Sequence, residues 1–124
     1  MELSSTLRPA GRTIDAYVPG GFRVGGERLA GSLLLLPDAT LRWEVAAVGD
    51  ITAENLAPAC DVMPPVDMLL IGCGERMALL PAGLRQMLRG RGLTVDLMGT
   101  PAACRTFNVL ISENRRVAAA LIAL

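Results

Sequence analysis

The 124-residue chain contains no histidine, and this absence excludes several chemistries. Without imidazole there is no Ser-His-Asp or Cys-His nucleophile system and no histidine ligand for a metal ion. Every basic residue is arginine, so the Schiff-base chemistry of lysine and the lysine of a phosphate-binding P-loop are excluded as well. The chain therefore favours a non-enzymatic protein, and we expect no cofactor.

Aromatic residues are also scarce, at 3% of the chain, and they are scattered at Tyr17, Phe22, Trp43 and Phe107. That is too few for a platform on which nucleic-acid bases stack. The formal net charge is zero, so no basic surface for nucleic acid is expected either. Zero net charge combined with 52% hydrophobic residues favours self-association, which makes a homo-oligomer one expectation.

Long apolar runs are missing. The longest, Leu33 to Leu36, is far shorter than the roughly 20 residues needed to span a bilayer, so no transmembrane segment is expected. The N-terminal stretch "MELSSTLRPAGR" has no apolar core and does not read as a signal peptide. We expect a cytoplasmic protein with a single domain over residues 1–124, in which residues 1–10 are loosely ordered.

Cysteine is present only as Cys60, Cys73 and Cys104, which lie far apart in the chain. No C-x-x-C pair exists, so a zinc ribbon and a thioredoxin-type motif are excluded and no metal site is expected. An odd number of cysteines in a cytoplasmic chain is typical of buried or free thiols.

The first half of the chain has the periodicity of β-strands. Alternation over 14–18, followed by glycine pairs at 20–21 and 25–26, predicts a hairpin or meander through residues 12–36. "GSLLLLPD" predicts a buried strand that Pro37 stops, and residues 41–45 alternate as a further strand with one wet face. Thr52 is a suitable cap for a short helix over 53–60.

From residue 66 onward the pattern changes to alternating strands and helices. "VDMLLIG" predicts a central strand covered on both faces, a helix follows Pro81, and "LTVDLM" predicts the next strand. Thr100-Pro101 is a strong helix start, in which the threonine hydroxyl is expected to act as the cap. Asn114 is expected to turn the chain in the left-handed conformation, and "RRVAAALIAL" predicts a final helix. This half should contain a parallel β-α-β unit.

The stretch "LLIGCGER" raises the first site hypothesis. Gly72-Cys73-Gly74 after a buried strand resembles the start of a dinucleotide-binding fingerprint, but the third glycine is absent and the helix begins only near Pro81. The loop at a strand's carboxyl end is still where open sheets bind ligands. The simpler interpretation, which we favour, is a tight turn with Cys73 tucked inward.

Two further hypotheses concern the helix that begins at Thr100. Cys104 lies near the helix N-terminus and beside Arg105, and both features lower a thiol's pKa, although a small buried residue is the better interpretation. Arg105 and Asn108 form a polar stripe that Arg115 extends, and this stripe is equally well a solvated face or a site for an anion or a partner. Asn108 is a poor choice in mid-helix unless its side chain has a function.

Asp67 lies at the start of an otherwise apolar run. We favour a buried structural carboxylate paired with an arginine, while an exposed position among the first residues of the strand is the alternative.

Three segments carry a resemblance to a known family: "GGFRVGGERLAGSLLLLP", "LLIGCGER" and "GTPAACRTFNVLISENRRVAAALI". Together they resemble the Mth-type uncharacterised domain over roughly residues 10–124. That family includes bacterial and archaeal stand-alone proteins, the mitochondrial assembly factor 3 of respiratory complex I and the adipogenesis-associated Mth-type domain protein. The resemblance implies a three-layer α/β fold with a central mixed β-sheet and an added N-terminal hairpin, and it implies no settled catalytic activity.

The leading hypothesis is a non-enzymatic binding or assembly-type factor with an unknown protein partner. The alternatives are a phosphate or carboxylate site in the crevice at Gly72–Arg76 and, more weakly, thiol redox chemistry through Cys104. No catalytic residue is expected. The expected ligand- or partner-binding residues are Gly72, Cys73, Gly74, Arg76, Arg105, Thr106, Asn108 and Arg115.

Overall fold

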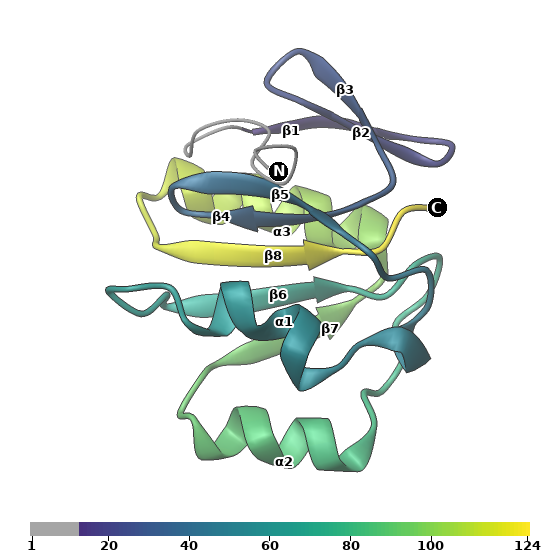
Figure 1. The fold of residues 1–124 in the computed structure, drawn as a ribbon. Helices are drawn as coiled ribbons and strands as arrows, with labels where there is room; N and C mark the ends of the chain where they lie inside the picture. The colour runs from purple at the N-terminus through teal and green to yellow at the C-terminus, as the bar shows by residue number, and fades with distance from the viewer. Residues whose placement is uncertain (1–12) are drawn as a thin grey trace.

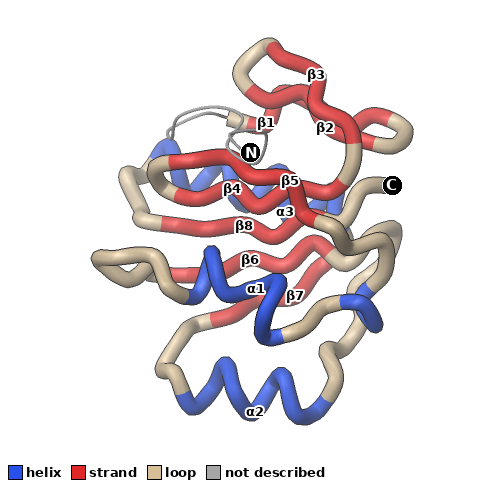
Figure 2. Tube along the Cα trace, viewed as in Figure 1, coloured by secondary structure: helices blue, strands red, loops and turns tan. Residues whose placement is uncertain are grey.

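The computed structural model describes residues 13–124, so the expectation for residues 1–10 lies outside the described residues. The strands are β1 (Ile14–Val18), β2 (Gly21–Val24), β3 (Glu27–Ala30), β4 (Ser32–Leu36), β5 (Ala39–Trp43), β6 (Met68–Gly72), β7 (Val95–Met98) and β8 (Val117–Leu121). The helices are α1 (Ala53–Cys60), α2 (Ala82–Gly90) and α3 (Thr100–Ser112), with a 3-10 turn over Val48–Asp50. Figures 1 and 2 show their arrangement.

The strands form two sheets. β1, β2 and β3 make a three-stranded antiparallel meander, as the glycine pairs predicted. The other five strands make a mixed sheet in the order β5-β4-β8-β6-β7. β6 and β7 are parallel and are joined through α2, which confirms the predicted β-α-β unit.

The domain has three layers, of which the five-stranded sheet is the middle one (Figure 1). One face is covered by α1 and α2, and the other by α3 together with the three-stranded sheet. Alternate residues of each strand point to opposite faces. On β6, for example, Leu69 and Ile71 face α1 and α2, whereas Leu70 faces α3. The three-layer α/β fold with a central mixed sheet is therefore confirmed.

The last predicted element is wrong, because "RRVAAALIAL" is not a helix. Its residues 117–121 form β8, which lies in the middle of the sheet, antiparallel to β4 and parallel to β6. Alanine favours helices in isolation, but a segment buried on both faces has no polar positions from which a period can be read. Small side chains suit this strand because helices cover both of its faces.

Several local signals are confirmed. α1 spans Ala53–Cys60, and the Thr52 side chain accepts a hydrogen bond from the Asn55 backbone N–H, as expected of a helix cap. Asn114 turns the chain with a φ of 59°. Among residues 13–124, no helix is both long and apolar enough to cross a bilayer.

Candidate functional site

The glycine turn after β6 is tightly packed. A Cβ atom at Gly72 would lie 3.0 Å from the Leu121 side chain and 3.0 Å from the Thr100 hydroxyl, so any other residue would require these neighbours to move. Gly74 has a φ of +101°, a conformation that side-chain-bearing residues rarely adopt. The two glycines thus serve different purposes, one for close approach and one for chain direction.

Thr100 joins this turn to the rest of the sheet. Its hydroxyl accepts a hydrogen bond from the Gly74 N–H at 2.9 Å and donates one to the Ile122 carbonyl at 2.8 Å. Its own N–H donates to the Gly74 carbonyl at 2.7 Å. Thr100 is fully buried, so these bonds satisfy backbone groups that water does not reach.

The predicted capping role of Thr100 is wrong for this reason. The residue that caps α3 is Gly99, and no side chain makes a capping hydrogen bond there. The Thr100 hydroxyl is held instead by Gly74 and Ile122, which are close only after the chain folds. A sequence pattern cannot distinguish these two uses of a threonine before proline.

The backbone N–H groups of the turn bear on the anion-binding alternative. Cys73 donates its N–H to the Met98 carbonyl at 2.8 Å, and Gly74 donates its N–H to Thr100. Both amides are therefore engaged inside the protein in this conformation. An anion site at Gly72–Arg76 would have to use the N–H groups of Glu75 and Arg76 together with the Arg76 guanidinium, and it stays a prediction.

Neither thiol of interest is placed for reactivity. Cys73 is buried, and its Sγ lies 3.5 Å from the Ala78 carbonyl oxygen. Cys104 is buried against the three-stranded sheet, and this burial raises its pKa to about 11, although the Arg105 guanidinium pulls the pKa down. The expected lowering of the Cys104 pKa by the helix N-terminus and Arg105 is therefore outweighed by desolvation.

Asn108 has the function that its position in mid-helix suggested, and that function is internal. Its Oδ1 accepts from the Ile14 N–H at 2.8 Å, and its Nδ2 donates to the Ile14 carbonyl at 2.8 Å. The amide thus imitates a neighbouring strand and docks β1 onto α3. Its polar atoms are engaged with β1 rather than with the glycine turn.

The arginines among the predicted residues are more dispersed. Arg115 lies beyond the end of α3, where its Nε is 3.9 Å from a carboxylate oxygen of Asp67. Asp67 is exposed just before β6, and it also accepts from the Arg116 N–H. The expected pairing with an arginine is therefore present, but the expected burial is wrong, and the alternative of an exposed position at the start of the strand is confirmed. Arg105 and Arg76 are exposed and have no ion-pair partner within residues 13–124.

The structure therefore brings together only part of the predicted set. Gly72, Cys73 and Gly74 pack against the beginning of α3, and Arg76 follows them in the exposed loop that leads to α2. Thr106, half-buried, and Arg105 lie on the second turn of α3. Within the described residues, no group of three or more acidic or cysteine side chains could hold a metal ion.

The loop between β6 and α2 has a feature that sequence reasoning missed. Met77 and Leu79 are 57% and 64% exposed, which is high for large apolar side chains in a chain this size. They flank the same turn as Arg76 and lie at the carboxyl ends of the parallel strands β6 and β7.

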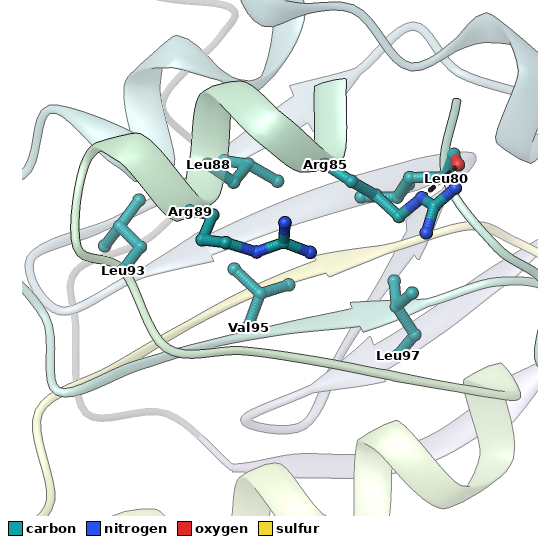
Figure 3. Close-up of a pocket in the computed structure, with 7 residues that line it drawn as sticks. All are labelled: Leu80, Arg85, Leu88, Arg89, Leu93, Val95 and Leu97. Atoms are coloured by element: carbon teal, nitrogen blue, oxygen red, sulfur yellow. Dashed lines mark hydrogen bonds between the residues drawn. The ribbon is translucent and has the colours of Figure 1, made fainter. Parts of the chain in front are cut away.

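A second missed feature is a pocket of about 210 Å³ between α2 and β7 (Figure 3). Its lining is Leu80, Arg85, Leu88, Arg89, Leu93, Val95 and Leu97. In the sequence, Leu84 and Leu88 are four residues apart, and each is followed directly by an arginine, so Arg85 and Arg89 are also four residues apart. That repeat places an arginine stripe beside the buried leucine stripe of α2, and it is the signal that could have indicated the pocket.

Taken together, these features define the class of the protein: a three-layer α/β domain with a closed glycine turn and exposed apolar side chains beside it. The chain belongs to the family described as protein of unknown function (DUF498/DUF598), whose model matches residues 14–122. The resemblance to the Mth-type domain is confirmed by a solution structure from Bordetella pertussis described as a Mth938-like domain. That chain is 29% identical with a TM-score of 0.75, and the match covers 98% of this chain and 92% of that one.

Other proteins are similar to this chain over most of its length. The zebrafish (Danio rerio) protein named NADH dehydrogenase (ubiquinone) 1 alpha subcomplex assembly factor 3 is 41% identical over 113 residues, covering 91% of this chain and 65% of that protein. An uncharacterised protein of Rhodobacter capsulatus is 39% identical, covering 88% of this chain and 82% of that protein. A crystal structure described as an outer membrane protein from Bartonella henselae is 36% identical with a TM-score of 0.86, covering 93% and 97% of the two chains.

The match to the vertebrate assembly factors is partial in length. This chain spans between 59% and 65% of the six of them that were compared. The shared part is the α/β domain itself, because the aligned stretch covers 88% or more of this chain.

Proposed function

We propose that the protein is a non-enzymatic cytoplasmic factor that binds a protein partner and assists the assembly of a larger complex. The observation that carries this proposal is the 41% identity, over nearly the whole chain, to a protein named as an assembly factor. That name belongs to a longer protein, so the role comes to this chain by analogy of its shared domain.

The surface that we assign to partner binding is the loop of residues 75–79 together with the second turn of α3. Met77 and Leu79 supply exposed apolar area, and exposed apolar side chains with polar neighbours are typical of protein-binding surfaces. Arg76 and Arg105 supply guanidinium groups that have no ion-pair partner among the described residues, and arginine is enriched at such interfaces. The path of this loop is fixed by the turn that precedes it, Gly72 to Gly74, which packs against the beginning of α3.

The proposal is tested by capturing the tagged protein from its native cells after cross-linking and identifying what co-purifies. We expect the wild type to recover the same partner repeatedly. Met77→Asp places a charge in the centre of the surface and should lower recovery about tenfold, equivalent to about 1.4 kcal/mol of binding free energy. The measurement is quantitative mass spectrometry of the recovered partner.

The matched control is Met63→Asp, because Met63 is 79% exposed in a different loop. This variant should recover the partner as well as the wild type does. Repeated failure of the wild type to recover any partner would contradict the proposed function. Equal loss in both variants would contradict the assigned surface alone.

A further inference from the structure

The outer edge of β7 is open. β7 is the last strand of the five-stranded sheet and pairs on one side only, with β6. The Thr94 and Met98 carbonyls both accept hydrogen bonds from the β6 side, from Leu69 and Cys73. Because backbone groups alternate direction along a strand, Val95 and Leu97 direct their N–H and C=O groups away from β6. No strand within residues 13–124 pairs with them.

The edge of the three-stranded sheet formed by β1 differs from that of β7. At β1 the Asn108 amide occupies both the N–H and the C=O of Ile14, which closes that position to another strand. At β7, no hydrogen bond from within residues 13–124 occupies the outward N–H and C=O groups of Val95 and Leu97, and the strand contains no proline or lysine of the kind that protects exposed edges. Its charged residue, Asp96, points to the face opposite the pocket, because Val95 and Leu97 line the pocket.

Beside this edge lies the pocket beneath α2. Its apolar lining comes from Leu80, Leu88, Leu93, Val95 and Leu97. A volume of about 210 Å³ is smaller than the pockets that hold drug-sized ligands, roughly 300–1,000 Å³, and is closer to the size of one large side chain. The pocket therefore suits a single apolar side chain presented from a backbone that runs along β7.

Two guanidinium groups stand at the same pocket (Figure 3). Arg85 is held in place, since its Nε donates to the Leu80 carbonyl at 3.0 Å. Arg89 has no hydrogen-bond or ion-pair partner within residues 13–124. None of the residues lining the pocket is acidic, so the positive charge of this site is not balanced locally. A carboxylate is the group that complements it.

We propose that the open edge of β7 and the pocket beneath α2 bind an extended, acidic segment of a protein partner by addition of a strand to the sheet. Backbone hydrogen bonds form to Val95 and Leu97. Alternate side chains of the bound segment, about 6.7 Å apart, face α2. One of them is apolar and fills the pocket, and the next is Asp or Glu and pairs with Arg85 and Arg89. This mode of recognition combines backbone affinity with side-chain specificity.

This surface differs from the loop of residues 75–79, so it goes beyond the proposed function and is tested separately. The probe is a phage-displayed library of random octapeptides selected against the purified full chain. We expect the enriched peptides to share an apolar residue and an acidic residue two positions apart. Synthetic copies should shift the amide NMR signals of Val95 and Leu97 and slow their hydrogen exchange.

The key variant is Arg89→Glu. Because the Arg89 side chain is exposed, this substitution should leave the fold intact. It should weaken binding of the selected peptides at least tenfold, and peptides carrying Lys in place of the acidic residue should bind it better than they bind the wild type. Arg105→Glu, on α3, is the matched control and should bind like the wild type. Met77→Asp should also leave peptide binding unchanged, which separates this test from that of the proposed function.

Several outcomes would overturn the proposal. The first is that selection enriches no peptide, and the second is that the enriched peptides lack an acidic residue. The third is that the selected peptides bind the wild type and Arg89→Glu with equal affinity. Concentration-dependent shifts at Val95 and Leu97 without peptide would assign the edge to a second copy of this chain instead. If decanoate binds in the pocket and no peptide does, the pocket is a site for a small amphiphile, and the proposal is overturned as well.

Discussion

At the scale of single residues, the functions of two polar side chains explain more of the fold than their positions in the sequence suggest. The Thr100 hydroxyl and the Asn108 amide each make two hydrogen bonds to backbone groups that are distant in the chain. Both side chains lie on α3, which is thereby joined to the glycine turn, to the segment after β8 and to β1. The energetic cost of losing such a side chain comes from the backbone groups left without partners.

Replacing Thr100 with valine tests this account. The Thr100→Val variant keeps the shape but leaves the Gly74 N–H and the Ile122 carbonyl buried without partners, so we expect a loss of about 2–4 kcal/mol in the free energy of unfolding. Thr100→Ser keeps the hydroxyl and should lose only about 1 kcal/mol for the missing methyl group. Denaturant titration of both variants provides the measurement. Equal stability of the two would contradict the bridging role.

Cys104 gives a pH-dependent prediction. Burial raises its pKa in the folded protein from 9.0 to about 11, so the folded state favours the protonated thiol. The stabilisation is fully present below pH 9 and is lost as the pH rises from 9 through 11. We expect the stability difference between wild type and Cys104→Ala to shrink by about 2 kcal/mol from pH 8 to pH 11. The measurement is the unfolding free energy of both proteins across that range.

A stability difference that stays constant with pH would show that Cys104 titrates normally in the folded protein. The same raised pKa predicts slow alkylation at pH 8, where only about one thiol in a thousand is ionised. Only alkylation of Cys104 clearly faster than that of a free cysteine would support the thiol-redox alternative.

At the scale of elements, α3 joins the two sheets. One of its sides packs on β6, β7 and β8, and it also contacts β1 of the three-stranded sheet. Within residues 13–124, the Asn108 side chain makes two hydrogen bonds that join α3 to the backbone of β1. The orientation of the small sheet therefore depends on this one side chain together with apolar packing around Phe22 and Phe107.

Asn108→Leu removes both hydrogen bonds while keeping an apolar side chain of similar size. We expect the Ile14 amide to exchange with solvent at least tenfold faster, and stability to fall by about 1–3 kcal/mol. The Leu70 amide in β6 should keep its protection, because the opening is confined to the small sheet. Hydrogen exchange followed by NMR measures both amides.

Asn108→Asp is the matched control, because its carboxylate still accepts from the Ile14 N–H but cannot donate to the Ile14 carbonyl. Its Ile14 amide should be protected better than in the leucine variant. If Asn108→Leu leaves the Ile14 amide as protected as in the wild type, apolar packing alone holds β1.

At the scale of the whole molecule, the sequence predicted elements whose signals are local. Glycine pairs and alternation indicated the β1–β3 meander, and Thr52 indicated the first helix with its bounds. What could not be predicted depends on distant contacts. β8 is a strand because β4 and β6 pair with it, and the Thr100 hydroxyl leaves the helix end because Ile122 and Gly74 meet there.

The candidate site follows the same division. The sequence located the glycine turn and the polar stripe of α3, because both are visible within a few neighbouring residues. It could not show that Asn108 faces β1, since those residues are 94 positions apart. Nor could it show the pocket of Arg85 and Arg89, which exists only once α2 lies beside β7.

The position of β8 also sets an order on how the chain can fold during synthesis. The β4–β5 hairpin and the β6–β7 unit both leave the ribosome before β8, yet neither pairs with the other, and each has its pairing edge toward β8. Two half-sheets with unpaired edges and exposed apolar faces must therefore wait for residues 117–121 before one core can close. In a nascent chain, β8 therefore emerges after both half-sheets and joins them into one five-stranded sheet.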